Sequence, residues 1–342
     1  MNILSLDTSA DETSCAIMSG RKVLSNVIFS QIILHEKWGG IFPTIAKRAH
    51  EERIDGVVET CLQKAKMTMD KIDYVAVTQG PGLAIALEVG ILKAKALSQQ
   101  YNKKLIAVNH LEGHIYSSFV QNSKGNPIRD FSFPYLALIV SGGHTEFVLF
   151  EDHLKYTVIG QTIDDASGEA LDKGGKLLGL GYPAGPVIER LSEEVENKEF
   201  FPFPRPMLKS NDLQFSFSGL KTSLLYFLKE RTQEENISQL KEIASSYQEA
   251  VFDTIIKKTK KAIRQTGINR LVVGGGVIAN KRLRNLLRAL VKNNEGTVLF
   301  PPYSYLTGDN AAMIGVVAYF KAEKKLFVNN IDDLDRIPRM NL

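Results

Sequence analysis

The sequence has few of the features that secreted and membrane proteins need. Its two cysteines, Cys15 and Cys61, are too few for a disulfide framework, which favours a reducing compartment. No uncharged apolar run reaches the roughly 20 residues of a membrane-spanning helix. Asp7 and Asp11 stand where a signal peptide would need apolar residues. We therefore expect a cytoplasmic protein.

The sequence also lacks a strong excess of charge of either sign. It has 42 lysines and arginines against 38 aspartates and glutamates, a formal net charge of +4. Such a balance does not by itself indicate nucleic acid, so a nucleic-acid site would have to come from local clustering. The length of 342 residues allows two domains of about 150–200 residues, each with its own core.

The same order of predicted elements occurs twice along the chain. The first half predicts strands at 3–6, 15–18 and 23–29, a helix at 50–66, a strand at 74–78, a glycine break and a helix at 83–97. The second half predicts strands at 135–140, 146–150 and 156–159, helices at about 166–178, 219–229 and 243–263, a strand at 271–273, a glycine break and a helix at 280–291. We expect an α/β protein of two similar lobes. The first spans 1–108 and is completed by helices from about 308–342, and the second spans 109–307 with helical insertions.

Two histidines, His110 and His114, stand four residues apart after a short predicted strand at 105–108. On a helix they would share one face, a spacing that suits two imidazoles binding one transition-metal ion. The pair alone is equally compatible with two packed or solvated histidines. Asp309, just before a late apolar helical pattern, is a candidate third ligand. Glu112 would point about 200° away from His110, which disfavours a zinc protease of the His-Glu-x-x-His type.

The second half of the chain has two glycine turns, each directly after a predicted strand. Ser141-Gly142-Gly143 lies between two predicted strands, and Gly274-Gly275-Gly276 separates a strand from a helix that begins near Asn280. Backbone N–H groups in such turns, and helix N-termini, can bind phosphate. Each turn alone is more often only a tight turn, and neither matches the P-loop or dinucleotide pattern. Together with the turn at Asp7, they suggest a nucleotide held in a cleft between the lobes.

Charged residues gather in three places. Asp165, Glu169 and Asp172 would share a helical face and could receive ribose hydroxyls, although helix capping by Asp164 or Asp165 is the commoner explanation. Basic residues form one cluster at Lys257–Arg264 and one stripe at Lys281, Arg284, Arg288 and Lys292. Solvated helix faces are the usual meaning of such groups, and contact with a phosphate backbone is the alternative.

These motifs, in this order, resemble the TsaD family of tRNA N6-adenosine threonylcarbamoyltransferases, formerly described as O-sialoglycoprotein endopeptidases. The resemblance runs from residue 3 to about residue 318 and is to the bacterial type. It rests on Asp7-Thr8-Ser9 with Asp11-Glu12-Thr13, Gly39-Gly40-Ile41-Phe42-Pro43, Gln79-Gly80-Pro81-Gly82, residues 109–114, 140–145 and 162–173, Tyr182-Pro183-Ala184-Gly185-Pro186, residues 274–280 and Gly308-Asp309-Asn310. Gly174-Gly175 replaces the family's more usual Thr-Ala or Val-Ala, and since glycine is a poor helix former we expect a looser helix there.

The resemblance implies an actin/Hsp70/sugar-kinase-like (ASKHA) fold, with two RNase H-like lobes and the active site between them. It implies one divalent metal ion, Fe²⁺ or Zn²⁺, on His110, His114 and Asp309. It also implies that threonylcarbamoyl-AMP is bound by Ile139, Val140, Ser141, Gly142, Gly143, Asp172, Gly185 and Asn280. Asp11 or Glu12 is our candidate for a general base.

The implied reaction transfers the threonylcarbamoyl group to N6 of adenosine 37, beside the anticodon, in tRNAs that read codons beginning with A. The implied partners are TsaB, bound through the N-terminal lobe, the ATPase TsaE, and TsaC, which supplies the adenylate. Two other functions fit the fold: an ATPase or small-molecule kinase, and a non-catalytic nucleotide-binding scaffold. Metal content distinguishes the transferase from both alternatives, because neither alternative needs the two histidines and the aspartate.

Overall fold

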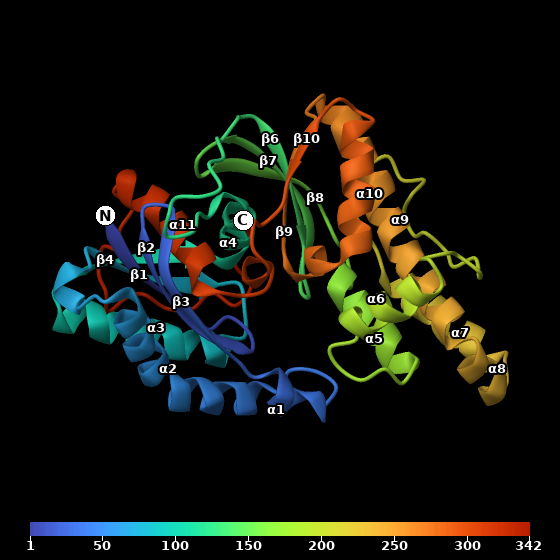
Figure 1. Ribbon diagram of the computed structural model, residues 1–342, viewed down its shortest axis with the longest axis horizontal. Coiled ribbons are helices and arrows are strands. Elements are labelled where there is room, and N and C mark those ends of the chain that lie inside the picture. Colours follow the sequence, from blue (N-terminus) through green and yellow to red (C-terminus); the bar gives the residue numbers. More distant parts are fainter. The chain divides into compact units, whose positions relative to one another are not determined.

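Two five-stranded mixed sheets organise the computed structural model, which describes residues 1–342. The chain divides into two units, each with one sheet. Unit 1 comprises Met1–Phe131 and Phe300–Leu342, and unit 2 comprises Ser132–Leu299. The elements of each unit can be followed by label and colour in Figure 1.

The sheet of unit 1 has the strand order β3-β2-β1-β4-β5. Its first three strands form an antiparallel meander, and the last two run parallel to β1. The strands are β1 (Asn2–Asp7), β2 (Glu12–Ser19), β3 (Lys22–Ser30), β4 (Tyr74–Gly80) and β5 (Lys104–Asn109). The helices are α1 (Ile32–Glu36), α2 (Pro43–Ala65), α3 (Ala84–Gln100), α4 (His110–Tyr116) and α11 (Ala311–Glu323), with 3₁₀ turns η1 (Met69–Lys71), η2 (Ser117–Phe119) and η4 (Ser304–Leu306).

Alternation along β1 directs side chains to both faces of this sheet. Leu4 and Leu6 belong to the apolar cluster that α2 and α3 complete, whereas Ser5 between them donates to the Ala311 carbonyl oxygen at the start of α11 (2.7 Å). Since successive side chains of a strand point to opposite faces, α2 and α3 cover one face and α11 covers the other. Figure 1 shows the same arrangement.

Unit 2 repeats this design, with the strand order β10-β9-β6-β7-β8. The meander is β6 (Tyr135–Val140), β7 (Thr145–Asp152) and β8 (Lys155–Gln161), and the parallel strands are β9 (Arg270–Gly274) and β10 (Thr297–Leu299). The helices are α5 (Ser167–Leu177), α6 (Gly185–Glu194), α7 (Ser218–Lys229), α8 (Gln233–Ser238), α9 (Leu240–Thr266) and α10 (Lys281–Lys292), with the 3₁₀ turn η3 (Gly276–Ala279). None of the helices in the structure combines the length and apolar character of a membrane span.

The predicted meanders and their following helices are present, but several elements differ from the expectation. The helix predicted at 50–66 begins at Pro43, because proline suits the first turn of a helix. The short elements α1, α6, α8 and β10 were not predicted. The helix of the two histidines was expected in the second lobe, yet α4 lies in unit 1, where it packs against α11 and β5.

The C-terminal region also differs from the expectation, because helices were expected over 308–342 and the structure has a single α-helix there, α11. Beyond it the chain runs in turns, because side chains such as Asn330, whose Oδ1 accepts from the Asp332 N–H, favour turns. This tail crosses the ends of β4 and β5. The Ile337 N–H donates to the Gln79 carbonyl (2.9 Å), and Asn109 Nδ2 donates to the Asn341 carbonyl (3.0 Å). A Cβ on Gly80 would lie 1.9 Å from the Ile337 oxygen, so only glycine allows this approach.

Candidate active site

The helix that carries the two histidines has a well-defined start. Asn109 ends β5 and caps α4, because its Oδ1 accepts a hydrogen bond from the Leu111 N–H (2.8 Å). His110 and His114 therefore lie one turn apart, both largely buried in unit 1. Their ring centroids are 4.6 Å apart.

Asp309 joins the two histidines, immediately before α11. Its Oδ1 lies 3.4 Å from His110 Nε2 and 3.4 Å from His114 Nε2, and the three potential ligand atoms lie within 4.8 Å of one another. Two imidazoles and a carboxylate are a donor set that first-row transition metals bind. The cluster is thus suited to hold one metal ion, and the spacing of the histidines in the sequence predicted its first two members.

The charges around this cluster also favour a cation. Asp7 Oδ1 lies 3.8 Å from His110 Nδ1 and accepts from Thr78 Oγ1 (2.7 Å), while Asp7 Oδ2 is buried with no hydrogen-bond donor from the protein. Burial opposes a charged His110, but attraction to Asp309 and hydrogen bonds with Asp309 and Asp7 outweigh it and raise the pKa of His110 to about 10. Carboxylates that favour a positive charge on His110 would also favour a metal ion at this position.

The two candidate bases lie at the start of β2, in the same unit. Burial raises the pKa of Asp11, and Asp309 adds to the effect by repulsion. Burial raises the pKa of Glu12 well above its ordinary value, with further repulsion from Asp309 and Asp11. Ser30 Oγ donates to Glu12 Oε1 (3.3 Å). A raised pKa makes the ionised carboxylate a stronger base, so both residues remain candidates for a general base.

Glu112 lies away from the metal cluster, as helical geometry predicts. Its carboxylate pairs with the Lys321 ammonium of α11 at 2.9 Å, and both side chains are largely buried. The arrangement of a His-Glu-x-x-His protease, in which a glutamate activates a metal-bound water, is therefore absent from α4.

The predicted substrate residues lie in unit 2 around the end of β6. Ile139 and Val140 are fully buried in that strand, and they position the turn that follows. In the following turn, the Ser141 N–H donates to the His144 carbonyl (2.9 Å). A Cβ on Gly142 or Gly143 would meet no atom within 4 Å, which leaves open space over this backbone.

Two other glycines let neighbouring segments approach this turn. The Gly168 N–H at the start of α5 donates to the Ser141 carbonyl (3.1 Å), and a Cβ there would lie 2.6 Å from the same oxygen. Gly275, with φ +99°, passes so close to the Val140 carbonyl that a Cβ would lie 2.4 Å from its oxygen. The turn η3 contacts both β6 and α5. The N-terminus of α5 and the segment leading to α10 thus meet at the end of β6, an arrangement that can bind an anion.

Asp172 and Asn280 each accept hydrogen bonds from backbone N–H groups at the start of a helix. Asp172 Oδ1 accepts from the Ala184 N–H (2.8 Å) and the Gly185 N–H (3.4 Å) at the start of α6. Asn280 Oδ1 accepts from the Leu283 N–H (3.1 Å), and its Nδ2 donates to Gln248 Oε1 (2.9 Å). These contacts hold both side chains beside the start of a helix.

The remaining acidic residues of this stretch have structural partners. Asp164 accepts from Ser216 Oγ (2.6 Å) and the Phe217 N–H (2.8 Å), so it serves the start of α7 and not that of α5. Asp165 and Glu169 both pair with Lys173, at 2.7 and 2.8 Å. Lys173 thus offsets one of the negative charges on the shared carboxylate face.

The glycine pair expected to loosen α5 lies inside a continuous helix. A Cβ on Gly174 would lie 2.3 Å from the ring of Tyr247, and one on Gly175 would lie 2.1 Å from Cβ of Ala184. Tyr247 also donates to the Ala170 carbonyl (2.9 Å). The two glycines allow α9 and the start of α6 to pack closely against α5.

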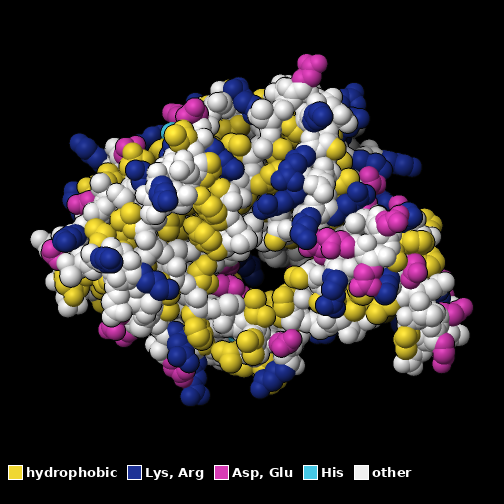
Figure 2. Space-filling view, viewed as in Figure 1, with side chains coloured by type: hydrophobic (Ala, Val, Ile, Leu, Met, Phe, Trp, Pro, Cys, Tyr) yellow, Lys and Arg dark blue, Asp and Glu magenta, His cyan; other side chains and the backbone are white.

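The two basic groups differ in their surroundings. Lys258 is 1% exposed and donates to Ser210 Oγ (2.9 Å), and Lys261 binds the Ser210 carbonyl, so these two lysines support a loop of unit 2. On α10, Lys281, Arg288 and Lys292 are exposed, while Arg284 Nε donates to the Ile278 carbonyl (2.6 Å). Figure 2 shows lysine and arginine side chains gathered over α10.

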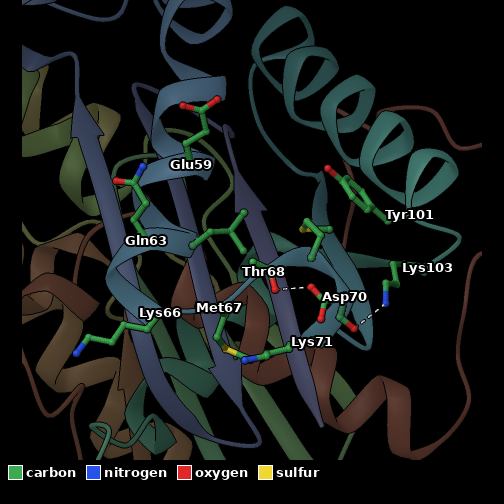
Figure 3. Close-up of a pocket in the computed structure, with 11 residues that line it drawn as sticks. Glu59, Gln63, Lys66, Met67, Thr68, Asp70, Lys71, Tyr101 and Lys103 are labelled. Carbon is green, nitrogen blue, oxygen red and sulfur yellow. Dashed lines mark hydrogen bonds between the residues drawn. The ribbon is translucent and has the colours of Figure 1, made fainter.

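A pocket of about 770 Å³ in unit 1 does not belong to this chemistry. It is lined by the end of α2, by η1 and by the residues before β5, among them Lys66, Asp70 and Lys103 (Figure 3). The pocket lies where β4 and β5 begin. Asp7, Gly80 and Asn109 lie at the other end of the sheet, as the last residues of β1, β4 and β5. Ligands of open α/β sheets usually bind at the carboxyl ends of the parallel strands.

Sequence reasoning missed Asp7 and Thr78 as neighbours of the metal cluster, and Lys321 as the partner of Glu112. The Asp-Thr-Ser turn after the first strand was a signal for Asp7, because a polar turn at the end of a buried strand often faces a site. Thr78 and Lys321 gave no signal, since an isolated threonine in a strand or a lysine in a helix is ordinary.

Comparison with known proteins gives both a family and a fold. Residues 22–316 match the family described as "TsaD: tRNA N6-adenosine threonylcarbamoyltransferase". The chain is 44% identical to the tRNA N6-adenosine threonylcarbamoyltransferase of Kosmotoga olearia, covering 100% of this chain and 99% of that one, and 43% identical to that of Thermosipho africanus, covering 100% of both. It is 46% identical to that of Syntrophotalea carbinolica, covering 92% of this chain and 90% of that one.

Solved structures with much lower identity share the architecture. Component A of the Acidaminococcus fermentans (R)-2-hydroxyglutaryl-CoA dehydratase has a TM-score of 0.53 at 14% identity, over 94% of this chain and 99% of that one. Full-length HypF has a TM-score of 0.59 at 15% identity, over 96% of this chain and 56% of that one. These likenesses show the fold alone, and they confirm the expected actin/Hsp70/sugar-kinase-like (ASKHA) class.

Proposed function

This chain belongs to the family of tRNA N6-adenosine threonylcarbamoyltransferases, and from that premise we propose how its residues carry out the transfer. The single observation that carries the proposal is the cluster of the buried His110 and His114 with Asp309 in a full-length member of the family. We infer that this cluster holds one Fe²⁺ or Zn²⁺ ion. Bound there, the ion would supply Lewis acidity towards the carbamoyl carbonyl of threonylcarbamoyl-AMP.

Residues at the end of β6 are proposed to hold the adenylate half of the substrate. Ile139 and Val140 lead into the turn Ser141-Gly142-Gly143, where open space over the two glycines lets their backbone N–H groups face a phosphate. Gly185 adds the N-terminus of α6. Oriented backbone dipoles of this kind stabilise phosphate without a charged side chain. Asp172 and Asn280, fixed beside the starts of α6 and α10, orient the nucleoside.

In the proposed reaction, N6 of the acceptor adenosine attacks the carbamoyl carbon. The new C–N bond forms, the bond from that carbon to the phosphate oxygen breaks, and AMP leaves with the electron pair. The proton lost from N6 goes to a carboxylate, for which Asp11 and Glu12 are the candidates. Burial raises the pKa of both groups, which makes the ionised form of either a stronger base for this proton.

The acceptor proposed is adenosine 37 of tRNAs that read codons beginning with A, unstacked from the anticodon loop so that N6 can be reached. The exposed basic residues of α10 are suited to a phosphate backbone. The partners proposed are TsaB and TsaE, with threonylcarbamoyl-AMP supplied by TsaC, and the location proposed is the cytoplasm.

Transfer of labelled threonine to tRNA by the purified protein with these partners tests the proposal. The double variant His110→Ala, His114→Ala should lose both stoichiometric metal, measured by elemental analysis, and transfer. Lys155→Met serves as the control, because its exposed pair with Glu151 includes no proposed site residue. Unchanged metal content in the double variant would remove the site assignment. ATP hydrolysis or kinase activity that persists in the double variant would favour an ATPase or a small-molecule kinase of the same fold.

A further inference from the structure

The longest stretch of exposed apolar side chains in unit 1 lies next to the turn of Asp11 and Glu12. Residues 32–42, which we call the aromatic loop, include Ile33 (83% exposed), Trp38 (50%) and Phe42 (43%). Figure 2 shows hydrophobic side chains at the surface over α1, which is part of this loop. Clustered apolar side chains at the surface of a globular protein indicate binding of another molecule.

Two aromatic rings of this loop form a pair. The chain turns at Gly39, whose φ is +64°, and the rings of Trp38 and Phe42 lie 5.1 Å apart with an interplanar angle of 30°. The Lys37 ammonium lies 5.3 Å from the centroid of the Trp38 ring. An exposed ring pair beside a flexible cation is the arrangement with which proteins bind single-stranded nucleic acid, since a base stacks on the ring and the cation meets a phosphate.

A chain of buried hydrogen bonds fixes this loop to the turn that carries the candidate bases. His50 Nε2 donates to the Ala10 carbonyl (3.1 Å), which leaves His50 Nδ1 to accept from Gln31 Nε2 (3.2 Å). Gln31 Oε1 then accepts from His35 Nε2 (3.3 Å). His35 Nδ1 accepts from the Phe42 N–H (3.3 Å), and the Gln31 N–H donates to the Asp11 carbonyl (2.9 Å).

One protonation pattern satisfies all of these bonds, with both imidazoles neutral and protonated on Nε2. Burial lowers the pKa of His35 and of His50, which favours this neutral form. The backbone on both sides of the ring pair is thereby held at a fixed distance from Ala10 and Asp11. An exposed surface with such support is placed for binding and is not merely an unpacked loop.

We propose that the aromatic loop is a stacking platform for an unpaired base of the tRNA anticodon loop, with Trp38 and Phe42 as the stacking rings and Lys37 as a phosphate contact. The inference rests on the proposed function, because an enzyme that modifies one base of a single-stranded loop must hold that loop open. Unpaired RNA bases are recognised chiefly by stacking on aromatic side chains. A protein partner bound to the same rings is the competing explanation.

The chain's single tryptophan supplies a direct test, since Trp38 is the only source of indole fluorescence. The probe is a short RNA hairpin with the unmodified adenosine anticodon loop, and the comparison is a fully paired duplex of the same length. We expect the hairpin to quench the emission of the wild-type protein to saturation and the duplex to leave it unchanged. Quenching by TsaB or TsaE alone, with none by the hairpin, would overturn the proposal.

Affinities of variants for the hairpin give the second measurement. Trp38→Ala should weaken binding about tenfold, as expected for the loss of one stacked base, while Trp38→Phe should retain most of it. Lys37→Gln should flatten the salt dependence, which Trp38→Ala should leave unchanged. Tyr226→Ala is the matched control, because Tyr226 is an aromatic residue 59% exposed on α7 of unit 2.

The thermal midpoint and the metal content show whether Trp38→Ala still folds. If it does not fold, the hairpin affinity of Trp38→Phe is compared with that of the wild type instead. Equal hairpin affinity in the wild type and Trp38→Ala overturns the platform. Transfer of threonine by the wild type, measured separately, distinguishes failure of the platform alone from failure of the proposed function.

Discussion

The Glu112 carboxylate lies 2.9 Å from the Lys321 ammonium, and this largely buried ion pair joins the helix of the two histidines to the helix that follows Asp309. Lys321 also donates to the Ala107 carbonyl of β5 (3.2 Å). Glu112 and Lys321 therefore help to hold α4, which carries His110 and His114, against α11, which follows Asp309.

Removing one partner of this pair should weaken metal binding. Lys321→Met leaves the Glu112 carboxylate buried without its cation, which we expect to cost about 3–5 kcal/mol of stability. The misplaced ligands should lose metal to a competing chelator about tenfold more readily. Unfolding curves and chelator titrations measure the two effects.

The double variant Glu112→Gln, Lys321→Met should recover part of both losses, because it leaves no unpaired charge. Lys155→Met, in an exposed pair, is the control and should change stability by less than about 1 kcal/mol. Metal retention equal to wild type in Lys321→Met would mean that the pair does not position the ligands.

The α10 stripe should determine the salt dependence of tRNA binding. Replacing Lys281, Arg288 and Lys292 by glutamine should weaken binding and reduce the slope of log affinity against log salt by about 0.9 for each phosphate that is no longer neutralised. Arg284 is left in place because it supports the Ile278 carbonyl. Lys258→Met is the contrast: it should lower the thermal midpoint and leave the slope unchanged. An unaltered slope in the triple variant would make the stripe a solvated surface only.

Asp172 should affect substrate binding more than the chemical step. Asparagine retains an oxygen that can accept from the Ala184 N–H, so Asp172→Asn should be milder than Asp172→Ala, and both should raise KM for threonylcarbamoyl-AMP more than they lower kcat. Steady-state kinetics across pH measure this. If Asp172→Asn lowers kcat strongly at unchanged KM and abolishes the acidic limb of the pH–rate profile, Asp172 is the base.

Glu146 should make the stability of unit 2 depend on pH. Burial raises the pKa of Glu146 to about 7 from its ordinary 4.5, so the folded state binds a proton that the unfolded state releases. The contribution of Glu146 to stability is therefore greatest below about pH 4.5, and it falls as the pH rises to about 7. Glu146→Gln should remove this dependence and stabilise the protein at pH 8 by at most about 3 kcal/mol. Thermal midpoints at several pH values measure it, and parallel curves for both proteins would contradict it.

The parts of the fold that the sequence predicted depend on contacts between near neighbours in the chain. Short apolar and β-branched runs predicted the strands at 135–140 and 23–29, and the spacing of His110 and His114 needs only one turn of helix. The unpredicted parts depend on distant residues. Nothing near Gly80 indicates that Ile337 will pack on it, and nothing near Lys258 indicates that Ser210 will make it a buried structural lysine.

The candidate site divides in the same way. The histidine pair was evident from its spacing, whereas Asp309 entered through its place before an apolar helix and through the family resemblance. Asp172 and Asn280 were predicted as substrate residues; a helix start was expected near Asn280, whereas the bond of Asp172 to the start of α6 could not be read from the sequence. Which side chain a helix start recruits depends on the tertiary packing of both segments.

Unit 1 is interrupted in the sequence by the whole of unit 2, and this has a consequence during synthesis on the ribosome. His110 and His114 emerge early, but Asp309 and α11 emerge only after residues 132–299. Until then the face of the first sheet that α11 covers stays bare, and the nascent chain has two of its three metal ligands. Since domains generally fold as they emerge, unit 2 can fold before unit 1 is complete, and a ribosome that stalls before residue 309 releases a chain unable to assemble the metal cluster.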